Sequence, residues 1–372
     1  MGEKIRVGLL YGGKSGEHEV SLQTALAVMK AFDYDKYEIK PFYITKQGGW
    51  YAGQTLLAAP TDVAQLQFAG AQGDTGGALM PVFEGLTTPA GAAAEAGRAI
   101  DVMFPLLHGT FGEDGTIQGL FEMANMPYVG AGVLASAVGM DKVLMKKVFA
   151  QEGLPQCIYR HFNRTQWEKD PQFFIMEIEV ALGYPCFVKP ANLGSSVGIS
   201  KAGNREELEA AVACAFRYDR KVIVEEFVDA REIEVSVLGN DEPRASVPGE
   251  VVSSNDFYDY KAKYTDGKSR MQIPADIPAE TAEAVREMAV RAFLAIDGSG
   301  LSRVDFFMRR SDGQLLINEV NTMPGFTPFS MYPLMWKETG LPYRELLDKL
   351  IQLALERHSE KQRIDYTGGG SE

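Results

Sequence analysis

The sequence predicts an α/β protein whose second half has α+β character. In the first half, short apolar runs alternate with helical patterns, which is typical of a parallel sheet with connecting helices. From about residue 232 onward, strand patterns dominate, and the last of them form a hairpin. A chain of 372 residues with 45% hydrophobic residues is long enough for two or three domains with a sizeable core.

The N-terminal part supplies the alternating strands and helices. Residues 5–11 are apolar almost throughout, as in a buried strand, and Gly12 interrupts the run. Between residues 65 and 97 the chain is rich in Ala and Gly and has weak periodicity, so we expect mainly loops and short elements there. In order, we predict a strand at 5–11, a loop at 12–19, a helix at 20–31, and strands at 39–44 and 100–107.

Asp141 marks the start of a helix and of a second domain. Asp is a favourable N-cap for a helix at 142–152, which Gly153 and Pro155 bring to an end. We therefore place a domain boundary here.

The rest of the chain contains both strands and helices. Asn204 and Glu207 have the spacing of a capping box, and an apolar helical stripe follows them. We predict strands at 186–189, 198–201, 222–228, 232–238 and 245–252, a hairpin at 303–321, and helices that start at 204, span 282–296 and span 346–355.

Composition limits the function classes. With 37 Lys and Arg against 50 Asp and Glu, the net charge of −13 argues against general binding to nucleic acid or to anionic membranes. Three widely spaced cysteines argue against a disulfide framework and favour a reducing compartment. The N-terminal apolar run is too short for a signal peptide or a membrane span. We therefore expect a cytoplasmic protein with no nucleic-acid or membrane partner.

The hairpin at 303–321 carries the strongest functional signal. With a turn centred on Asp312, Asp305 pairs with Glu319 and Arg303 pairs with Asn321. Side chains alternate along strands, so all four project from one face, which Ile317 would share. Two carboxylates and an amide oxygen suit Mg²⁺, which usually serves substrate phosphates. The alternative interpretation is a solvated polar face.

Residues 8–15 match the phosphate-binding P-loop pattern, but their context does not fit. Residues 9–11 are the apolar end of a strand, and Glu17 and Glu19 follow where phosphates would lie. The better interpretation is a turn at the carboxyl end of a strand, where ligands of open α/β sheets bind. Glu17 would then suit a substrate ammonium group; the alternative is an acid in the first turn of a helix.

Four other segments are weaker signals. The Gly-Ser loop at 192–198, with Lys189 before it, suits a phosphate but could be a plain hairpin loop. Residues 225–228 end a strand and could face an adenine, but alone they could be any polar strand exit. His108 follows a strand and precedes glycines, which favours function over core packing. The aromatic and charged segment at 257–268 suggests a long functional loop.

Together these segments resemble the motifs of D-alanine–D-alanine ligases, which belong to the ATP-grasp family of carboxylate–amine ligases. The resemblance extends from about residue 5 to residue 358 and is weak across 45–99. The residues that carry it are 12–21, 108–115, 140–142, 189–190, 194–198, Arg303 with Asp305, 318–321 and 324–325.

The resemblance implies a three-domain ATP-grasp fold, with domains at 1–140, 141–229 and 230–360 and a flexible tail at 361–372. It also implies a homodimer, and ATP held between the central and C-terminal domains. To ATP it assigns Lys142, Lys189, Ser195, Ser196, Glu225, Glu226, Val228, Glu232, Lys263 and Asn318. To two Mg²⁺ ions, which Mn²⁺ can replace, it assigns Asp305, Glu319 and Asn321. To two D-alanines it assigns Glu17, His108, Lys263, Arg303, Gly325, Ser330 and Met331. To catalysis it assigns Glu17, Ser196, Tyr264, Arg303 and Gly325.

The implied reaction forms D-alanyl-D-alanine for the cell wall through an acyl phosphate made with ATP. Because an acyl phosphate hydrolyses in water, the reaction needs a covering loop, and we expect residues 254–268 to form it. One departure from the family pattern is Glu226, where relatives often carry Lys or Gln. Tyr264 implies an amine as second substrate, because resistance-type relatives that use D-lactate have another residue there. The alternatives are an ATP-grasp ligase with other substrates, a non-catalytic nucleotide-binding protein, and a P-loop NTPase that depends on Lys14.

Overall fold

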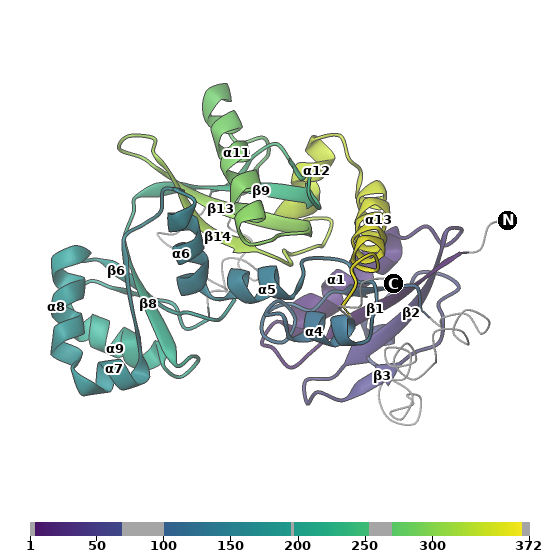
Figure 1. Ribbon diagram of the computed structural model, residues 1–372, viewed down its shortest axis with the longest axis horizontal. Helices are drawn as coiled ribbons and strands as arrows, with labels where there is room; N and C mark the ends of the chain where they lie inside the picture. Colours follow the sequence, from purple (N-terminus) through teal and green to yellow (C-terminus); the bar gives the residue numbers. More distant parts are fainter. Residues whose placement is uncertain (1–3, 69–99, 195–196, 253–269, 367–372) are drawn as a thin grey trace, which may run out of the picture.

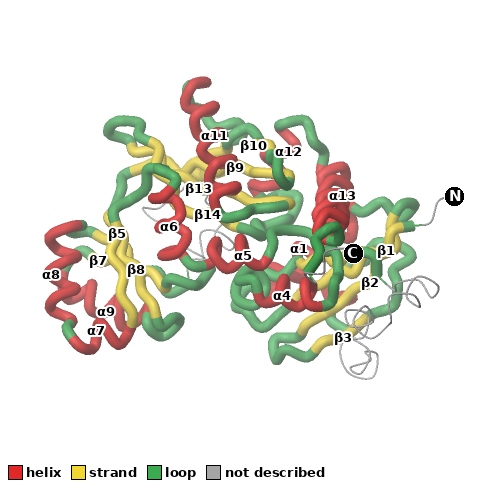
Figure 2. Tube along the Cα trace, viewed as in Figure 1, coloured by secondary structure: helices red, strands yellow, loops and turns green. Residues whose placement is uncertain are grey.

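A computed structural model describes residues 4–68, 100–194, 197–252 and 270–366 of the chain (Figure 1). These residues contain three β-sheets with helices packed around them, as Figure 2 shows. The strands of each sheet come from one stretch of the sequence. The mixture of helices and sheets predicted from the sequence is therefore confirmed.

The first sheet lies in the N-terminal part and has the strand order β3–β2–β1–β4. Strand β1 pairs in parallel with both β2 and β4, as the alternation of strands and helices predicted. The strand predicted at 100–107 is shorter in the structure. The elements are β1 (Ile5–Gly12), α1 (His18–Ala31), β2 (Tyr37–Ile44), β3 (Trp50–Ala52), the 3₁₀ helix η1 (Val63–Leu66), β4 (Val102–Pro105), α4 (Thr116–Met123) and α5 (Val133–Met140).

Strand β1 also settles the P-loop question. Residues 9–11 pair with β2 along their whole length, and α1 begins only at His18. A P-loop needs a helix that opens directly at its Lys-Ser pair, here Lys14 and Ser15. The match to the P-loop pattern is therefore fortuitous.

The second sheet is antiparallel, with the order β5–β8–β6–β7. Asp141 caps α6, which leads into this part, by accepting hydrogen bonds from Val143 N and Leu144 N, as predicted. The elements are α6 (Lys142–Gln151), β5 (Tyr159–Asn163), α7 (Arg164–Lys169), α8 (Pro171–Ala181), β6 (Cys186–Pro190), β7 (Ser200–Ala202), α9 (Arg205–Ala215) and β8 (Lys221–Glu226).

Side-chain alternation gives this sheet two different faces. Val188 and Val224 point to the face that α8 and α9 cover, where they join a hydrophobic core. Ile223 points to the opposite face and packs against Val143 of α6. Lys189 of β6 and Glu225 of β8 therefore share the face that looks toward α6.

The third sheet is antiparallel, with the order β12–β11–β9–β13–β14, and β10 pairs with β9. Helix α11 packs on it through Val285, Ala289 and Phe293. The single strand predicted at 245–252 is wrong: two strands replace it, because Pro248 cannot donate a ladder hydrogen bond. The elements are β9 (Ala230–Gly239), β10 (Arg244–Ala245), β11 (Gly249–Val252), β12 (Arg270–Gln272), α11 (Ala279–Ala295), β13 (Gly300–Arg309), β14 (Leu315–Asn321), α12 (Met331–Glu338) and α13 (Tyr343–Lys361).

The hairpin of β13 and β14 has the predicted pairs, Arg303 with Asn321 and Asp305 with Glu319. Its turn is shifted, however, because Met308 pairs with Leu315, and a bulge at Asn318 restores the register. The bulge also moves Ile317 to the core face, where it is fully buried, so the expectation that it shares the polar face is wrong.

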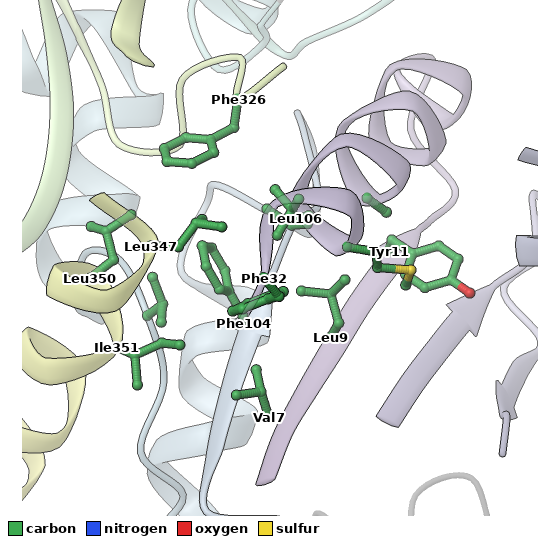
Figure 3. Packing of buried hydrophobic residues seen from close by; sticks show 14 of the residues in the cluster. Val7, Leu9, Tyr11, Phe32, Phe104, Leu106, Phe326, Leu347, Leu350 and Ile351 are labelled. Atoms are coloured by element: carbon green, nitrogen blue, oxygen red, sulfur yellow. The ribbon is translucent and has the colours of Figure 1, made fainter. Parts of the chain in front are cut away.

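Helix α13 ties the C-terminal part to the N-terminal sheet. Figure 3 shows Leu347, Leu350 and Ile351 of this helix close to Phe104 of β4, within one hydrophobic core. Arg357, further along α13, donates hydrogen bonds to the carbonyl oxygens of Tyr128 and Gly130. Among the described residues, no helix is both long and apolar enough to cross a membrane.

Candidate active site

A cavity of about 570 Å³ lies between the N-terminal sheet, the start of α6 and the hairpin of β13 and β14. It brings together residues that are far apart in the sequence. Of the residues assigned from the sequence, it is lined by Glu17, His108, Lys142, Arg303, Glu319, Asn321, Gly325, Ser330 and Met331. A smaller cavity of about 200 Å³, beside α13, contains none of them.

Glu17 reaches the cavity from the start of α1. It occupies the N-cap position, yet its side chain makes no capping hydrogen bond, and only 8% of the residue is exposed. Gly109 lies against it with a φ of +73°, and a Cβ at Gly109 would stand 2.5 Å from Glu17 Oε2. Only glycine combines that φ with that close approach. Glu17 is thus both an acid at a helix start and part of the cavity wall.

His108 is buried beside Glu17, just after β4. Its Nδ1 lies 3.3 Å from Met323 O, and its Nε2 lies 3.2 Å from Thr24 Oγ1. A carbonyl oxygen can only accept, so neutral His108 carries its hydrogen on Nδ1. Burial lowers the pKa of His108, and the charge of Glu17 offsets this only in part. His108 is therefore neutral near pH 7.

Glu113 is a second carboxylate on this wall of the cavity. Its Oε2 accepts a hydrogen bond of 2.6 Å from Gly109 N, so one glycine contacts both acids. Burial raises the pKa of Glu113, and the neighbouring charge of Glu17 raises it further. This wall carries acidic groups and a neutral imidazole, which is a suitable setting for an ammonium group.

Another part of the cavity wall is the polar face of the hairpin. We call Arg303, Asp305, Glu234, Glu319 and Asn321 the hairpin cluster. Arg303 binds Asp305 through two hydrogen bonds of 2.7 Å, and its Nε lies 3.0 Å from Glu234 Oε2. Burial would lower the pKa of Arg303, but the neighbouring carboxylates raise it well above its usual value. Asn321 Nδ2 donates to Asp305 at 2.9 Å.

The hairpin cluster has the chemistry of a magnesium site. Asp305 and Glu319 lie opposite each other on paired strands, and Asn321 adds an amide group at the same face. Each carboxylate oxygen has two lone pairs, so the bonds from Arg303 leave Asp305 able to coordinate a cation. The cluster has several oxygen donors and more negative than positive charge, which suits Mg²⁺ or Mn²⁺.

A second buried group of charges lies between α6 and the second sheet. We call Lys146, Lys189 and Glu225 the lysine cluster. Lys189 Nζ is 2.5 Å from Glu225 Oε2, and Lys146 Nζ is 3.1 Å from Glu225 Oε1. Burial would raise the pKa of Glu225, but the charges of Lys146 and Lys189 lower it to about 2. The carboxylate is therefore ionised and lies between two lysines.

Lys142 belongs to neither cluster but lies close to both. It lies one helical turn before Lys146 on α6, donates to Leu193 O at 2.8 Å, and its Nζ is 3.6 Å from Glu319 Oε2. The segment after β6 therefore contacts the same lysine that faces the hairpin.

Gly325 and Ser330 form the end of the cavity beyond the hairpin. Ser330 immediately precedes α12, and its Oγ accepts a hydrogen bond from Thr327 N at 3.1 Å. A Cβ at Gly325 would lie 3.1 Å from Ser330 Oγ, so the backbone of Gly325 lies close to the side chain of Ser330. Met331 lines the cavity next to them.

Other residues assigned from the sequence lie elsewhere. Glu226 accepts a hydrogen bond from Ile158 N, Glu232 lies in β9, Val228 follows β8, and Asn318 forms the bulge of β14. The described residues that line the cavity include none of these four. They also do not include Asp305, Lys189 or Glu225. Ser195, Ser196, Lys263 and Tyr264, and the predicted covering loop, lie outside the described residues.

Sequence reasoning missed three charged residues of this region. Lys146 follows Lys142 at the i+4 position of a helix, a spacing that could have identified it. Glu234 pairs with Asp305 across β9 and β13, which the sequence could not show without the strand order. Glu113 lay inside a segment already singled out, but its carboxylate was not assigned.

The chain is similar to known proteins over nearly its whole length. The family model described as "D-ala D-ala ligase N-terminus" matches residues 6–131, and "D-ala D-ala ligase C-terminus" matches residues 148–352. A D-alanine--D-alanine ligase of Bacillus cytotoxicus is 57% identical over 98% of this chain and 99% of its own length. One of Geobacillus thermodenitrificans is 56% identical, again over 98% of this chain and 99% of its own length.

Solved structures of D-alanine ligases have the same fold as this chain. The VanG D-Ala:D-Ser ligase of Enterococcus faecalis superposes with a TM-score of 0.80 at 37% identity, over 95% of this chain and 100% of its own. The D-alanine-D-alanine ligase of Coxiella burnetii has a TM-score of 0.77 at 32% identity, over 97% of both chains. The predicted ATP-grasp arrangement is therefore confirmed.

Proposed function

The chain belongs to the D-alanine–D-alanine ligase family, and from that premise we propose how its residues join two D-alanines. The reaction uses ATP and yields D-alanyl-D-alanine for peptidoglycan synthesis. One observation carries the assignment of residues: a single cavity has an acidic wall at Glu17 and a metal-type cluster at the hairpin. An ammonium group and a phosphorylated carboxylate therefore have suitable neighbours within one space.

The first D-alanine binds at the acidic wall. The Glu17 carboxylate holds its ammonium group, which leaves the substrate carboxylate pointing toward Arg303. His108 lies on the same wall. A substrate carboxylate beside it would favour protonation of the imidazole, and the Nε2–H would then donate to that carboxylate instead of contacting Thr24 Oγ1. Positioning of this kind supplies much of the rate enhancement in phosphoryl transfer.

ATP phosphorylates that carboxylate. Lys142 and Lys189 hold the phosphates together with Ser195 and Ser196, and Asp305, Glu319 and Asn321 hold two Mg²⁺ ions or their Mn²⁺ substitutes. Bound magnesium supplies positive charge that offsets the charge of the transferring phosphoryl group. We assign Glu225, Glu226 and Val228 to the adenine, Glu232 to the ribose, and Lys263 and Asn318 to the nucleotide and its metal.

The amine of the second D-alanine then attacks the acyl phosphate and displaces phosphate. Arg303 and the Gly325 N–H stabilise the negative oxygen that forms, a contribution of about 3–4 kcal/mol for donors of this type. Ser330, Met331 and Lys263 hold the second substrate. Tyr264 and Ser196 orient the reacting groups, and residues 254–268 cover the site, since an acyl phosphate hydrolyses in water.

The wider organisation follows the same family premise. We propose the three domains 1–140, 141–229 and 230–360, with a tail at 361–372, a homodimer and a cytoplasmic location. Neither a nucleic acid nor a membrane is a partner in this proposal.

Phosphate release tests the proposed function. ATP and Mg²⁺ are incubated without amino acid, with D-alanine or with L-alanine, and products are identified by mass. We expect release only with D-alanine, at one phosphate for each dipeptide. Release that does not depend on an amino acid would contradict the proposal and support an NTPase.

The second substrate needs a separate test, because one structural relative is a D-Ala:D-Ser ligase. Mixtures of D-alanine with D-serine or D-lactate show which acceptor is used. The higher identity to D-alanine--D-alanine ligases, 57%, predicts the D-alanine dipeptide as the main product. A mixed dipeptide or an ester formed at an equal rate would overturn this assignment.

A further inference from the structure

Lys146 is the one member of the lysine cluster to which the proposed function gives no role. Lys146 is only 1% exposed, although lysine is rarely buried so completely. The ammonium group lies 3.1 Å from Glu225 Oε1 and 5.9 Å from the ring centroid of Tyr159. A charge held this deeply without a function would be an unusual cost to the fold.

Lys146 and Lys189 contact different oxygens of the Glu225 carboxylate. Lys146 binds one carboxylate oxygen and Lys189 binds the other, so the cluster has two positive charges and one negative. If Lys146 were absent, Lys189 and Glu225 would form a neutral pair. With Lys146 present, the cluster has an excess of one positive charge, which an anion can satisfy.

The excess positive charge of the lysine cluster lies near the cavity. Lys146 and Lys142 lie one turn apart on α6, and Lys142 lines the cavity. Lys189 and Glu225 lie on the sheet face that looks toward α6. The pKa of Lys189 is raised, because Glu225 and Glu319 outweigh the effect of its burial, so Lys189 keeps its charge.

We propose that Lys146 is a positioning residue for nucleotide binding, an inference that rests on the proposed function. It keeps Glu225 compensated while Lys189 turns from that carboxylate to the phosphates of ATP. Lys146 touches neither the substrate nor the reacting atoms, and it acts through Glu225.

The test is MgADP binding by isothermal titration calorimetry to the full chain and its variants. Lys146→Met preserves side-chain length and leaves Glu225 paired with Lys189. Lys147→Met is the matched control, because Lys147 is the next residue of α6 and is exposed. We expect Lys146→Met to weaken MgADP binding about tenfold, a change that corresponds to roughly 1.4 kcal/mol. Lys147→Met should leave binding unchanged.

Two further readouts separate positioning from a merely structural role. In Lys146→Met the KM for ATP should rise, while the KM for D-alanine stays near that of the wild type. In a Glu225→Gln background, Lys146→Met should have a much smaller effect on MgADP affinity, because the carboxylate through which it acts is neutral. Wild-type affinity in Lys146→Met, or an equal loss of ATP and D-alanine binding, would overturn the inference. A wild-type protein that does not bind MgADP would contradict the proposed function as well.

Discussion

The hairpin cluster and the lysine cluster use the same kinds of charge in opposite proportions. In the hairpin cluster, one guanidinium lies among the carboxylates of Asp305, Glu234 and Glu319. In the lysine cluster, two ammonium groups lie on one carboxylate. Buried charges are stable when they are compensated, so the first cluster favours a cation and the second an anion. MgATP provides both.

Lys142, one helical turn before Lys146 of the lysine cluster, lies 3.6 Å from Glu319 of the hairpin cluster, so the two clusters are neighbours. Each cluster alone could be explained as a structural ion-pair network. The opposite excess charges of two neighbouring clusters are harder to explain without a ligand that carries both signs. The predictions below change one cluster at a time, in order of expected effect.

The largest effect is expected for Glu319→Gln. This variant removes one negative charge from the hairpin cluster and keeps the shape of the side chain. We expect dipeptide formation to fall by about 10³-fold or more, a loss of the size seen when transition-state charge stabilisation is removed. The unfolding temperature should change little. Near-normal turnover in Glu319→Gln would contradict the metal assignment.

Arg303→Lys is expected to have the next largest effect. Lysine keeps the charge that compensates Asp305 and Glu234, but it lacks the planar fork that makes two bonds to Asp305. We expect kcat to fall by about 10²-fold, with stability retained. Arg303→Ala is the contrast: it leaves both carboxylates without their cation and should cost roughly 3–5 kcal/mol of stability. Similar unfolding temperatures in the two variants would argue against compensation by Arg303.

Acid should weaken the lysine cluster through Glu225. Its pKa is about 2 in the folded protein, below the ordinary value of 4.5, so the ionised form stabilises the fold at neutral pH. That contribution, roughly 3 kcal/mol, is lost as pH falls from about 5 toward 2. The difference in unfolding temperature between wild type and Glu225→Gln should therefore shrink on acidification. A difference that does not depend on pH would contradict the ionised state of Glu225.

Gly109 gives the smallest predicted effect and the best control. Gly109 and Gly313 have the same φ of +73°, but a Cβ at Gly109 meets Glu17, whereas one at Gly313 meets nothing within 4 Å. Alanine at either position should cost about 1–2 kcal/mol of stability through backbone strain. Only Gly109→Ala should also raise the KM for the first D-alanine. A similar rise in Gly313→Ala would show that the effect is general destabilisation.

The hairpin shows how far the sequence can predict such a site. Alternation and turn residues were enough to pair Asp305 with Glu319, because strand periodicity is a local property. The bulge at Asn318 was not predictable, and the register came out right only because it offsets the shifted turn. The prediction that Ile317 shares the polar face was wrong because the bulge was not foreseen.

The lysine cluster shows where prediction from sequence ends. Lys189 could be found because a glycine-rich loop follows its strand. Lys146 and Glu225 meet through the packing of α6 on a sheet, which depends on tertiary structure. Glu234 likewise enters the hairpin cluster only because β9 lies next to β13. The chemistry of each motif was thus visible in the sequence, but the balance of charge was not.

The most direct test of the account is the number of Mn²⁺ ions bound in the presence of saturating ADP, measured by electron paramagnetic resonance. The wild type should bind Mn²⁺ in an ADP-dependent way, and Glu319→Gln should lose part or all of that binding. Lys189→Met should instead lose ADP affinity, because it changes the cluster that favours the anion. If both variants bound Mn²⁺ and ADP like the wild type, the two clusters would be structural and the account of the site would be wrong.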